Sequence, residues 1–574
     1  MRRPGSHDWP YALFLGAVLV SFIFLGIRLF HLQVVKGDYY RNLSSSNHIR
    51  VVARPAPRGR ILDRNGVVLA DNEPAFMVSV VPSEFDTTTI DLVADGLEMD
   101  IAVIRESLEQ ASALPHRPFV LREGMSVEQV SSTAENLFRT PGVIVDIAPL
   151  RRYGMADDFS HLLGYVGLSD DAETYRGEVV GRAGLELSLN ETLRGSPGLR
   201  REVVDAHGRV VETFESTVEE VPVPGSDVTL TVDAELQAIA TMELEASGMP
   251  ASAVLIDYIS GDILCAASVP AFDPNLFARG ISSDEWSRLL EDPDKPLFSR
   301  AWAATYPPAS TFKVVTASYL LSQGLLTPSY MPDPCYGVYS LGGTDFRCWS
   351  THGRLNIVQA LERSCDVFFY RTCQLGSLDG LVSFAARFGL GSTVTEVLVG
   401  EKAGSIPDSD GLDRRYGSGG WGLGNLLNYS IGQGELLATP LQMASMAGIV
   451  ASRGEMTVPG IILGRDQAPK LFSGDDLPDD TWDIVSQGMR NVVTAQRGTL
   501  HAVFAGMSLE VWGKTGTAEC PGENHALVIG FVREPRPVAF CIVVEHGGNG
   551  STAAGPVARR ILEAWLCGDE TDAS

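Results

Sequence analysis

The chain has 574 residues, of which 45 are Lys or Arg and 71 are Asp or Glu, so its formal net charge is −26. This acidic balance excludes the basic surface on which nucleic-acid binding depends. The hydrophobic share of 45% excludes an intrinsically disordered chain, and the length exceeds that of a typical single domain of about 150 residues. Eight cysteines are too few for a disulfide scaffold in a chain of this size.

The N-terminus contains a candidate membrane anchor at residues 11–28. Residues 11–27 read YALFLGAVLVSFIFLGI without a charge, close to the minimum of about 17 residues for a membrane-spanning helix. A cleaved signal peptide and a buried core helix are the alternatives, but RLFHLQVVKG follows where a small-residue cleavage site would stand. We therefore expect an uncleaved anchor preceded by a short tail at residues 1–10. Basic residues flank both ends of the anchor, so its orientation needs other evidence.

Residues 29–235 are predicted to form a strand-rich N-terminal module. Turn residues separate short alternating runs in ARPAPRGRILDRNGVVLADN, and strand-like sequence returns between Leu185 and Thr231. Residues 83–150 have a helical and acidic pattern, which predicts a small exposed lobe. We place the domain boundary near Asp233.

Residues 236–574 are predicted to form a second domain, in which strands at both ends enclose helices. Such an order is typical of an α+β layer structure. The predicted elements are a hairpin at Ala253–Ser268, an apolar helix at Phe312–Leu325, buried strands at Leu527–Phe531 and Ala539–Glu545, and a closing helix at Ala553–Leu566.

Ser310 and Lys313 form the first candidate catalytic pair, just before the apolar helix. Residues three apart share a helix face at about 5 to 6 Å between Cβ atoms, so the lysine amine would lie within reach of the serine hydroxyl. A lysine can activate a serine only where desolvation or nearby cations keep the amine neutral, and the apolar helix supplies such surroundings. The alternative is a capping serine and a surface lysine, because a Ser-x-x-Lys pattern arises by chance about once in a chain of this length.

Two further patterns supply polar groups. Lys514-Thr515-Gly516-Thr517 follows a short strand-like run, and its cation, hydroxyls and glycine backbone suit a strand edge that binds a peptide carboxylate. Ser364-Cys365-Asp366 lies within LNIVQALERSCDVFFY, and Ser364 could pass a proton. An ordinary turn and a helix cap are the alternatives for these two patterns.

The three motifs, in this order, resemble the active-site motifs of penicillin-binding proteins and serine β-lactamases. The segments YPPASTFK, SCDVFFY, SIGQGELLATPLQMA and KTGTAE, together with RPAPRGRILDRNGVVLADN, resemble a class B enzyme of the penicillin-binding protein 2 type. The resemblance covers nearly the whole chain. It implies an α+β fold with an elongated pedestal at residues 29–235, followed by a transpeptidase domain at residues 236–574 with a central antiparallel sheet and flanking helices.

The resemblance also implies an activity, that of a peptidoglycan D,D-transpeptidase of cell elongation. Ser310 would attack the D-Ala-D-Ala carbonyl, Lys313 would take its proton, and Ser364 and Lys514 would relay protons to the leaving amine. The backbone N–H groups of Ser310 and Thr517 would form an oxyanion hole. β-Lactams would acylate the same serine, D,D-carboxypeptidase activity would be a side reaction, and catalysis would require no cofactor. The residues implied to bind the substrate are Asp366, Thr515, Gly516 and Thr517.

Location and partners follow from the resemblance as well. It implies a single-pass protein of the inner membrane, with a cytoplasmic N-terminus and a periplasmic catalytic domain. The implied ligands are peptidoglycan stem peptides and β-lactams. The implied protein partners are a membrane-embedded SEDS-family glycan polymerase and elongation scaffold proteins.

Two residues depart from the family pattern. Ala309 stands where the family usually has glycine, which adds a Cβ beside the nucleophile. Asp366 stands where many members have asparagine, and an ionised carboxylate accepts hydrogen bonds but does not donate them. Related elongation-type enzymes carry aspartate at this position too.

Four potential metal ligands fall close together in the sequence: Cys335, Cys348, His352 and Cys365. Three thiolates and one imidazole would complete a tetrahedral structural zinc site before the second motif. Some members of the resembling family bind zinc with a histidine and a cysteine at the positions of His352 and Cys365. A Cys335–Cys348 disulfide and free buried thiols are the alternatives.

Other functions remain open at this point. A β-lactamase would share the motifs but lack a long anchored N-terminal module. A non-catalytic β-lactam sensor or scaffold would keep the fold alone. The septal class B enzyme usually has asparagine in its second motif, so Asp366 favours the elongation type.

Overall fold

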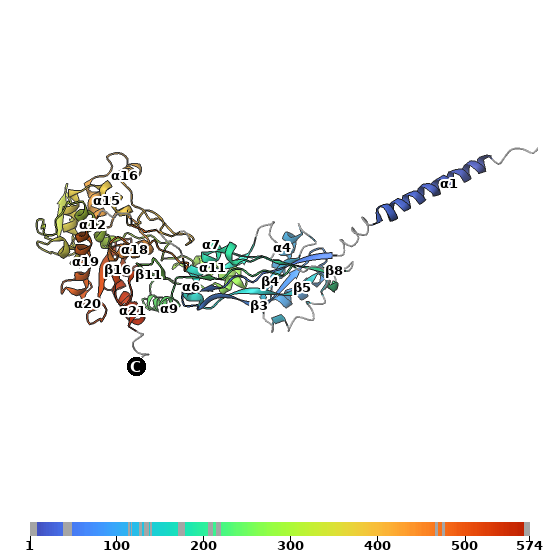
Figure 1. The fold of residues 1–574 in the computed structure, drawn as a ribbon, viewed down its shortest axis with the longest axis horizontal. Helices are drawn as coiled ribbons and strands as arrows, with labels where there is room; N and C mark the ends of the chain where they lie inside the picture. The colour runs from blue at the N-terminus through green and yellow to red at the C-terminus, as the bar shows by residue number, and fades with distance from the viewer. Residues whose placement is uncertain are drawn as a thin grey trace, which may run out of the picture.

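The computed structural model gives an elongated molecule with a long N-terminal helix, a narrow pedestal and a wider C-terminal body (Figure 1). The structure describes residues 9–37, 49–112, 115, 118–125, 129–130, 137, 140–169, 178–204, 210–213, 220–395, 397–464, 469–472 and 477–567. The predicted tail at residues 1–10 lies almost entirely outside this range.

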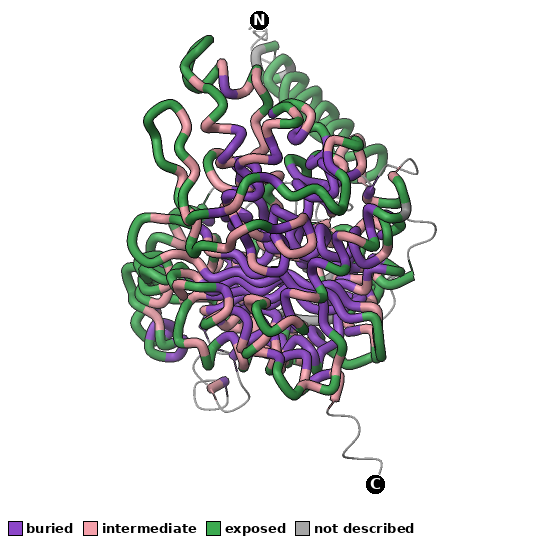
Figure 2. The backbone as a smooth tube through the Cα atoms, turned by 90° about the vertical axis from the view of Figure 1, so that its left-hand side faces the viewer, coloured by how far each residue is buried: buried purple, intermediate pink, exposed green. Residues whose placement is uncertain are grey.

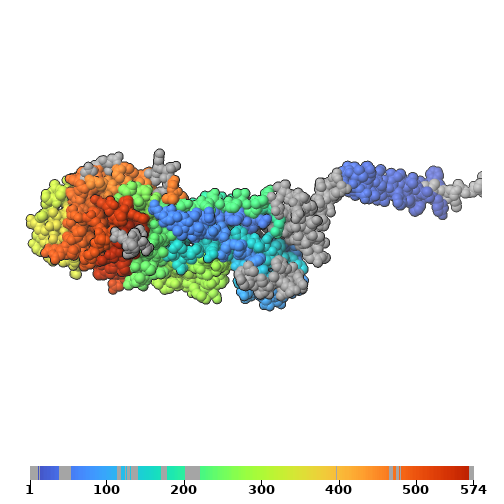
Figure 3. Space-filling view, turned by 60° about the horizontal axis from the view of Figure 1, so that its bottom comes forward, coloured from blue at the N-terminus to red at the C-terminus, as the bar shows by residue number. Residues whose placement is uncertain are grey.

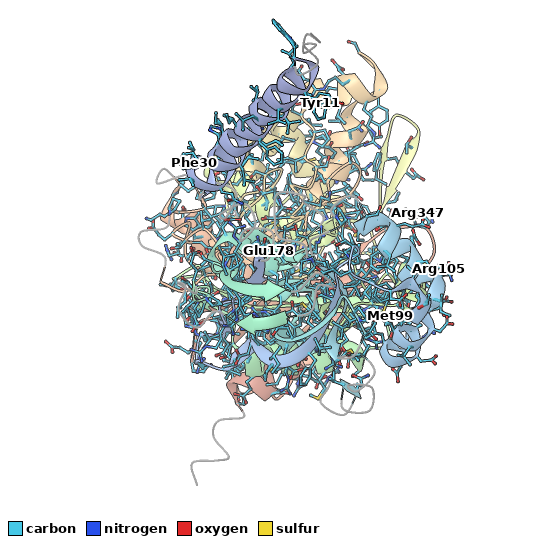
Figure 4. All side chains as sticks on the ribbon, turned by 90° about the vertical axis from the view of Figure 1, so that its right-hand side faces the viewer. Tyr11, Phe30, Met99, Arg105, Glu178 and Arg347 are labelled. Atoms are coloured by element: carbon cyan, nitrogen blue, oxygen red, sulfur yellow. The ribbon has the colours of Figure 1, made fainter. Side chains whose placement is uncertain are left out.

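Helix α1 (Trp9–Phe30) contains the predicted anchor and continues as the π-helical turn η1 (His31–Val35). A segment of 23 residues, Leu13–Val35, has a mean hydropathy of 2.4 and is not buried against the rest of the protein. Figure 4 shows side chains on all sides of this helix between Tyr11 and Phe30. An exposed helix of this length and apolarity is what a bilayer-spanning anchor requires, and the sequence prediction is consistent with it.

The pedestal is built on two β-sheets, which are antiparallel apart from one short parallel pair. The strands of these sheets are β1 (Ile49–Arg54), β2 (Ile61–Leu62), β3 (Val68–Val80), β4 (Phe119–Met125), β5 (Val143–Tyr153), β8 (Gly198–Val204), β9 (Val210–Thr213) and β10 (Val228–Thr229). One sheet has the order β1-β8-β9, and the other has the order β10-β2-β3-β4 with β5 also paired to β3. The long β3–β5 ladder extends from Ala70 opposite Tyr153 to Val80 opposite Val143, and its length gives the pedestal its extended shape.

The predicted lobe is not purely helical. Strand β4 and the start of β5 fall within it, together with the helices η2 (Thr87–Thr89), α3 (Ile90–Leu97) and α4 (Ile101–Ala111). Met99 and Arg105, labelled in Figure 4, mark these helices at one side of the molecule. Residues such as Val78 and Leu97 form a separate small core. The acidic helical pattern therefore predicted the helices α3 and α4 of the lobe, whereas its strands β4 and β5 had no clear signal in the sequence.

Between β5 and β8, the pedestal has short helices and strands around one buried carboxylate group. These elements are α6 (Ala156–Leu163), β6 (Val166–Leu168), β7 (Val179–Gly181), α7 (Gly184–Ser188) and α8 (Asn190–Leu193). The expectation of strand from Leu185 onward is therefore wrong for its first residues, which form two helical turns. Glu186 on α7 is fully buried and forms ion pairs of 2.7 Å with Arg58 and 2.6 Å with Arg151.

The C-terminal body contains a five-stranded antiparallel sheet with the order β12-β11-β17-β16-β15. The strands are β11 (Ala251–Asp257), β12 (Ile263–Val269), β15 (Val511–Ala518), β16 (His525–Val532) and β17 (Val538–Val544). Helices α9 (Ala234–Glu245) and α21 (Ala554–Leu566) cover one face, and α18 (Pro440–Ala451) covers the other. Every residue of α18 is buried, and Figure 2 shows the buried strands at the centre of the body. The α+β prediction with a central antiparallel sheet is confirmed.

The remaining elements surround this sheet. They are α10 (Asn275–Ala278), α11 (Ser283–Glu291), η3 (Ala309–Phe312), α12 (Lys313–Ser322), β13 (Val338–Leu341), β14 (Thr344–Arg347), α13 (Ile357–Glu362), α14 (Asp366–Thr372), η4 (Cys373–Leu375), α15 (Leu378–Ala386), α16 (Ser409–Tyr416), α17 (Leu423–Ser430), α19 (Asp479–Thr494) and α20 (His501–Phe504).

Asp63 connects the pedestal to the C-terminal body. One of its carboxylate oxygens accepts hydrogen bonds from the backbone N–H groups of Asn65 and Val67, and the other accepts from Ala234 at the start of α9. The side chain is fully buried, so these bonds replace its lost hydration. Figure 3 shows the blue and cyan pedestal meeting the orange and red body without an exposed linker between them.

Candidate active site

A strained turn presents Ser310 at the start of α12. The helical turn η3 precedes α12 directly, and Ala309 within it has a φ of 50°. This left-handed backbone favours glycine, so Ala309 holds a Cβ in a conformation that residues with side chains rarely adopt. The turn is held because the Ala309 N–H donates to the Gly432 carbonyl at 2.7 Å. Ser310 is half-buried, whereas its neighbours on either side in η3 are buried.

Ser310 lines a cavity of about 550 Å³ together with all three predicted motifs. Ser364 and Asp366 of the second motif and Thr515, Gly516 and Thr517 of the third motif contribute to its wall. Arg347, labelled in Figure 4, ends β14 and lines the same cavity. The structure therefore brings together residues that are up to about two hundred positions apart in the sequence.

The Ser364 hydroxyl lies between two buried lysine amines. Lys313 Nζ is 3.2 Å from Ser364 Oγ, and Lys514 Nζ is 2.9 Å from the same oxygen. Both lysines are fully buried, and Ser364 has a φ of 52°, a conformation that is uncommon for a residue with a side chain. Such strain is tolerated where the surrounding contacts hold a group in a required position. The hydroxyl is thus placed to exchange protons with either amine.

Asp366 holds the Lys313 amine. Its carboxylate oxygen Oδ1 is 2.6 Å from Lys313 Nζ, and the same amine donates to the Ser364 carbonyl at 2.9 Å. Burial raises the pKa of Asp366, and the ion pair with Lys313 opposes that rise. Aspartate at this position therefore orients a catalytic-site lysine, a contact that the sequence did not predict.

The predicted contact between Lys313 and Ser310 is not formed as a hydrogen bond. Among the described residues, no hydrogen bond joins the Ser310 hydroxyl to the Lys313 amine, because that amine is engaged by Ser364 and Asp366. About one helical turn separates the two residues along the chain.

Lys514 lies in an environment that favours the neutral amine. Complete burial, with a smaller contribution from the nearby Lys313, lowers the pKa of Lys514 well below its ordinary value. Its amine donates to the Thr515 carbonyl at 3.0 Å in addition to the Ser364 hydroxyl. A buried lysine of this kind can exchange a proton with the Ser364 hydroxyl to which it is hydrogen-bonded.

Strand β15 forms an edge of the sheet beside the nucleophile. It pairs with β16 alone in the described sheet. The third motif, which lies on this strand, packs against the η3 turn. A Cβ on Gly516 would lie 3.0 Å from Thr311 Cγ2 and 3.2 Å from the Pro308 carbonyl oxygen, so glycine permits this close approach. The edge leaves backbone groups available to an extended peptide.

Sequence reasoning missed several residues of the cavity wall. Gln433 donates from Nε2 to the Thr517 carbonyl at 3.1 Å, and Thr499 lies 2.9 Å from the Thr515 hydroxyl. Gln433 belongs to the SIGQG segment, which carried a resemblance but no assigned role. Asn524 and Asn549 also line the cavity and had no sequence signal, because each comes from an irregular loop.

The predicted cysteine and histidine cluster is assembled beside the cavity. The ligand atoms of Cys335, Cys348, His352 and Cys365 all lie within 4.8 Å of one another. The distances from His352 Nδ1 are 3.8 Å to Cys335 Sγ and 3.5 Å to Cys348 Sγ. All eight cysteines are free, so the alternative Cys335–Cys348 disulfide is absent from the structure. A hydrogen bond from Cys365 lowers the pKa of the Cys348 thiol, and Cys348 Sγ accepts the Asp366 N–H at 3.3 Å.

Comparison with known proteins identifies two family regions. Residues 251–563 match the penicillin binding protein transpeptidase domain, and residues 53–230 match the penicillin-binding protein dimerisation domain. The peptidoglycan D,D-transpeptidase MrdA of Escherichia coli (strain K12) is 31% identical over 97% of this chain and 93% of its own length. The peptidoglycan D,D-transpeptidase FtsI of the same strain is 24% identical over 98% of this chain and 91% of its own length.

A solved structure shows the same architecture. Penicillin-binding protein 2 of Helicobacter pylori, in complex with MreC, is 26% identical with a TM-score of 0.80 over 91% of this chain and all of that chain. The family regions, the greater identity to MrdA and this structural match agree with the geometry of the three motifs. The chain therefore belongs to the class B penicillin-binding proteins, within the penicillin-binding protein 2 type.

Proposed function

We propose that this protein is a peptidoglycan D,D-transpeptidase in which Ser310 forms the acyl-enzyme. The Ser310 oxygen forms an ester with the penultimate D-alanine carbonyl of a donor stem peptide, and the bond to the terminal D-alanine breaks. Lys313 takes the serine proton, and Ser364 with Lys514 delivers a proton to the leaving amine. An amine of a neighbouring stem peptide then attacks the ester, forms the cross-link and releases Ser310.

One observation carries this proposal: the Ser364 hydroxyl is within hydrogen-bond distance of both Lys313 and Lys514, in the wall of the cavity that Ser310 lines. This arrangement supplies a hydrogen-bonded proton route from Lys313 through Ser364 to Lys514. Thr515 and Thr517 on the edge strand are proposed to bind the terminal carboxylate, with Gly516 allowing close approach. The backbone N–H groups of Ser310 and Thr517 are proposed as the oxyanion hole, and Asp366 is proposed to position Lys313 rather than to donate to the substrate.

The test is cross-linking by the full-length protein in detergent with uncross-linked glycan strands that carry pentapeptide stems. We expect cross-linked dimers and one released D-alanine for each cross-link. Release of D-alanine without dimers would instead indicate a D,D-carboxypeptidase, and an absence of both would indicate a sensor or scaffold. A β-lactamase would turn over a fluorescent penicillin rather than retain it.

Replacing Lys514 with arginine is expected to lower the acylation rate by about 10²- to 10⁴-fold, because arginine keeps the positive charge but cannot release a proton. In the unchanged protein the rate should fall as the pH rises through the lowered pKa of Lys514, since the amine then lacks the proton that it delivers through Ser364. Stopped-flow acylation by a fluorescent penicillin as a function of pH measures both effects.

The matched control for this variant is Lys295→Arg, at an exposed lysine of the C-terminal body. It should leave the pH profile unchanged. A Lys514→Arg variant that is folded and acylates within about threefold of the original rate would contradict the proton-relay role.

Orientation and partners are proposed from the anchor and the family. The chemistry takes place on the cell wall, so we place the catalytic domain in the periplasm and the N-terminus in the cytoplasm of a single-pass inner-membrane protein. The match to a penicillin-binding protein 2 that was solved with MreC supports an elongation scaffold partner for this chain. A SEDS-family glycan polymerase is proposed from the family resemblance alone. We also retain the proposed domain bounds: anchor 11–28, pedestal 29–235 with a lobe at 83–150, and transpeptidase 236–574.

We further propose that Cys335, Cys348, His352 and Cys365 hold a structural zinc ion. Zinc–sulfur bonds of about 2.3 Å and zinc–nitrogen bonds of about 2.0 Å place tetrahedral donors about 3.4 to 3.8 Å apart, and the separations from His352 Nδ1 are 3.8 and 3.5 Å. The ion would supply no catalytic chemistry. Its ligands would fix the loop before Asp366 and thereby position Ser364.

Replacing Cys335 with serine is expected to lower the zinc content by one ion per chain and to slow acylation by about tenfold, because the loop before Ser364 loses a tether. Elemental analysis and fluorescent-penicillin acylation measure these effects. Cys567→Ser, at a half-buried cysteine outside the cluster, should change neither. Counting six rather than eight thiols in the denatured, unreduced protein would support the disulfide alternative instead.

A further inference from the structure

A second group of metal-ligating side chains lies at the rim of the active-site cavity, apart from the first cluster. The ligand atoms of Cys520, His525 and His546 all lie within 4.8 Å of one another. Cys520 and His525 are half-buried and His546 is exposed, so solutes can reach them. The proposed transpeptidase mechanism uses none of these residues.

Strand pairing brings these residues together. Cys520 lies in the turn between β15 and β16, and His525 is the first residue of β16. His546 follows the end of β17, whose Val544 is opposite Ala526 on β16. The ends of adjacent strands therefore place a thiol and two imidazoles at one end of the sheet, although 26 positions separate Cys520 from His546 in the sequence.

The distances within the group resemble those of a metal site. Cys520 Sγ is 3.9 Å from His546 Nδ1, close to the spacing of about 3.6 Å for a sulfur and a nitrogen bound to one tetrahedral zinc ion. The two imidazole rings have centroids 4.8 Å apart. The Glu523 carbonyl oxygen accepts hydrogen bonds from Cys520 Sγ at 3.0 Å and from His546 Nδ1 at 2.9 Å, so the thiol, this imidazole and an oxygen donor converge.

The surrounding contacts hold the two histidines in place. His546 has a φ of 55°, and its N–H donates to His525 Nδ1 at 3.1 Å. The ring of Tyr306 packs edge-on against His525 with centroids 5.4 Å apart. The Tyr306 hydroxyl donates to Glu545 at 2.7 Å, and Glu545 pairs with Arg300 at 3.2 Å. An ion pair and a hydrogen bond thus hold Glu545, the residue next to His546.

We propose that Cys520, His525 and His546 form a zinc site at the rim of the active-site cavity, with the fourth position taken by the Glu523 carbonyl oxygen or a water. A thiolate with two imidazoles selects zinc over magnesium or calcium, which prefer oxygen ligands. Binding displaces the thiol proton to solvent, moves the His546 ring proton from Nδ1 to Nε2, and replaces the hydrogen bonds that Cys520 and His546 donate to the Glu523 carbonyl. The hydrogen bond from the His546 N–H to His525 Nδ1 is also replaced when that nitrogen is the ligand.

The position of the site gives the ion a defined structural effect. Glu519 and Asn524, in the turn that contains Cys520, line the cavity, and Asn549 and Ser551 line it from the loop after His546. The ion would tie these two segments together across the cavity mouth. It would thereby fix the rim against which a substrate peptide lies.

Cobalt substitution of the full-length protein tests the proposal, because a Co²⁺–thiolate bond gives a sulfur-to-metal charge-transfer band. The metal-free protein is loaded with Co²⁺ alone, and the spectrum of a Cys520→Ser variant is subtracted from that of the unchanged protein. We expect a difference spectrum with one charge-transfer band from a single thiolate. Zinc content should fall by one ion per chain in Cys520→Ser and in His546→Asn, independently of the first cluster.

The matched controls are Cys567→Ser, a half-buried cysteine far along the chain, and His501→Asn, a half-buried histidine on α20. Both should keep the metal content and the spectrum. Zinc should also raise the melting temperature more in the unchanged protein than in Cys520→Ser. Equal zinc content and a flat difference spectrum, with the variants folded, would overturn the proposal. This outcome would leave cross-linking by Ser310 unaffected, so the two proposals fail separately.

Discussion

Ser310→Ala is expected to abolish covalent labelling by a fluorescent penicillin and to reduce cross-linking by on the order of 10³-fold or more. The variant removes the only oxygen proposed to form the acyl-enzyme, and Ser364, the next hydroxyl in the cavity wall, is held by two lysines rather than directed at the substrate. Gel fluorescence after incubation with the labelled penicillin measures acylation, and chromatography of digested peptidoglycan measures cross-linking.

An exposed serine gives the matched control for this substitution. Ser283 lies at the start of α11 on the surface, and Ser283→Ala should label at the original rate. The melting temperatures of both variants should match that of the unchanged protein, because Ser310 is only half-buried. Persistent labelling of a folded Ser310→Ala protein would mean that another residue is the nucleophile, and the proposed mechanism would be wrong.

Glu186→Ala is expected to destabilise the pedestal by about 3 to 5 kcal/mol, because it leaves two buried guanidinium groups without a counter-charge. The side chains of Arg58, Arg151 and Glu186 are 4%, 0% and 0% exposed, and the ion pairs measure 2.7 and 2.6 Å. Arg151 also donates to the Gly59 carbonyl at 2.8 Å, so loss of the carboxylate would loosen the strand arrangement around it. Calorimetry of the full chain in detergent should show the pedestal transition at a lower temperature.

An exposed ion pair in the same pedestal gives the comparison. Arg60 and Asp227 are 49% and 42% exposed and lie 2.7 Å apart, so Asp227→Ala should cost less than about 1 kcal/mol. The large difference between these variants tests burial rather than charge, because each removes one carboxylate paired with arginine. Similar melting temperatures for the two variants would show that the buried network contributes little to stability.

The local elements of the C-terminal body could be predicted from the sequence. The predicted hairpin at Ala253–Ser268 corresponds to β11 and β12, and the predicted closing helix corresponds to α21 at Ala554–Leu566. These segments have continuous apolar runs or a regular periodicity, which local sequence reports well. The lobe at residues 83–150 was predicted less completely, because the burial of β4 and β5 depends on packing against α3, α4 and β3, which local sequence pattern does not report.

The sequence by itself determined the motifs, the apolar anchor segment and the chemical identity of Ser310, Lys313, Ser364 and Lys514, since each depends on residue type and short-range spacing. Only the tertiary structure decided that Asp366 holds Lys313, that Glu186 neutralises two arginines, and that Cys520 meets His546. These contacts join segments tens to more than a hundred residues apart. Their formation depends on strand order and on the direction of each side chain, which are set by packing of the whole domain rather than by local sequence.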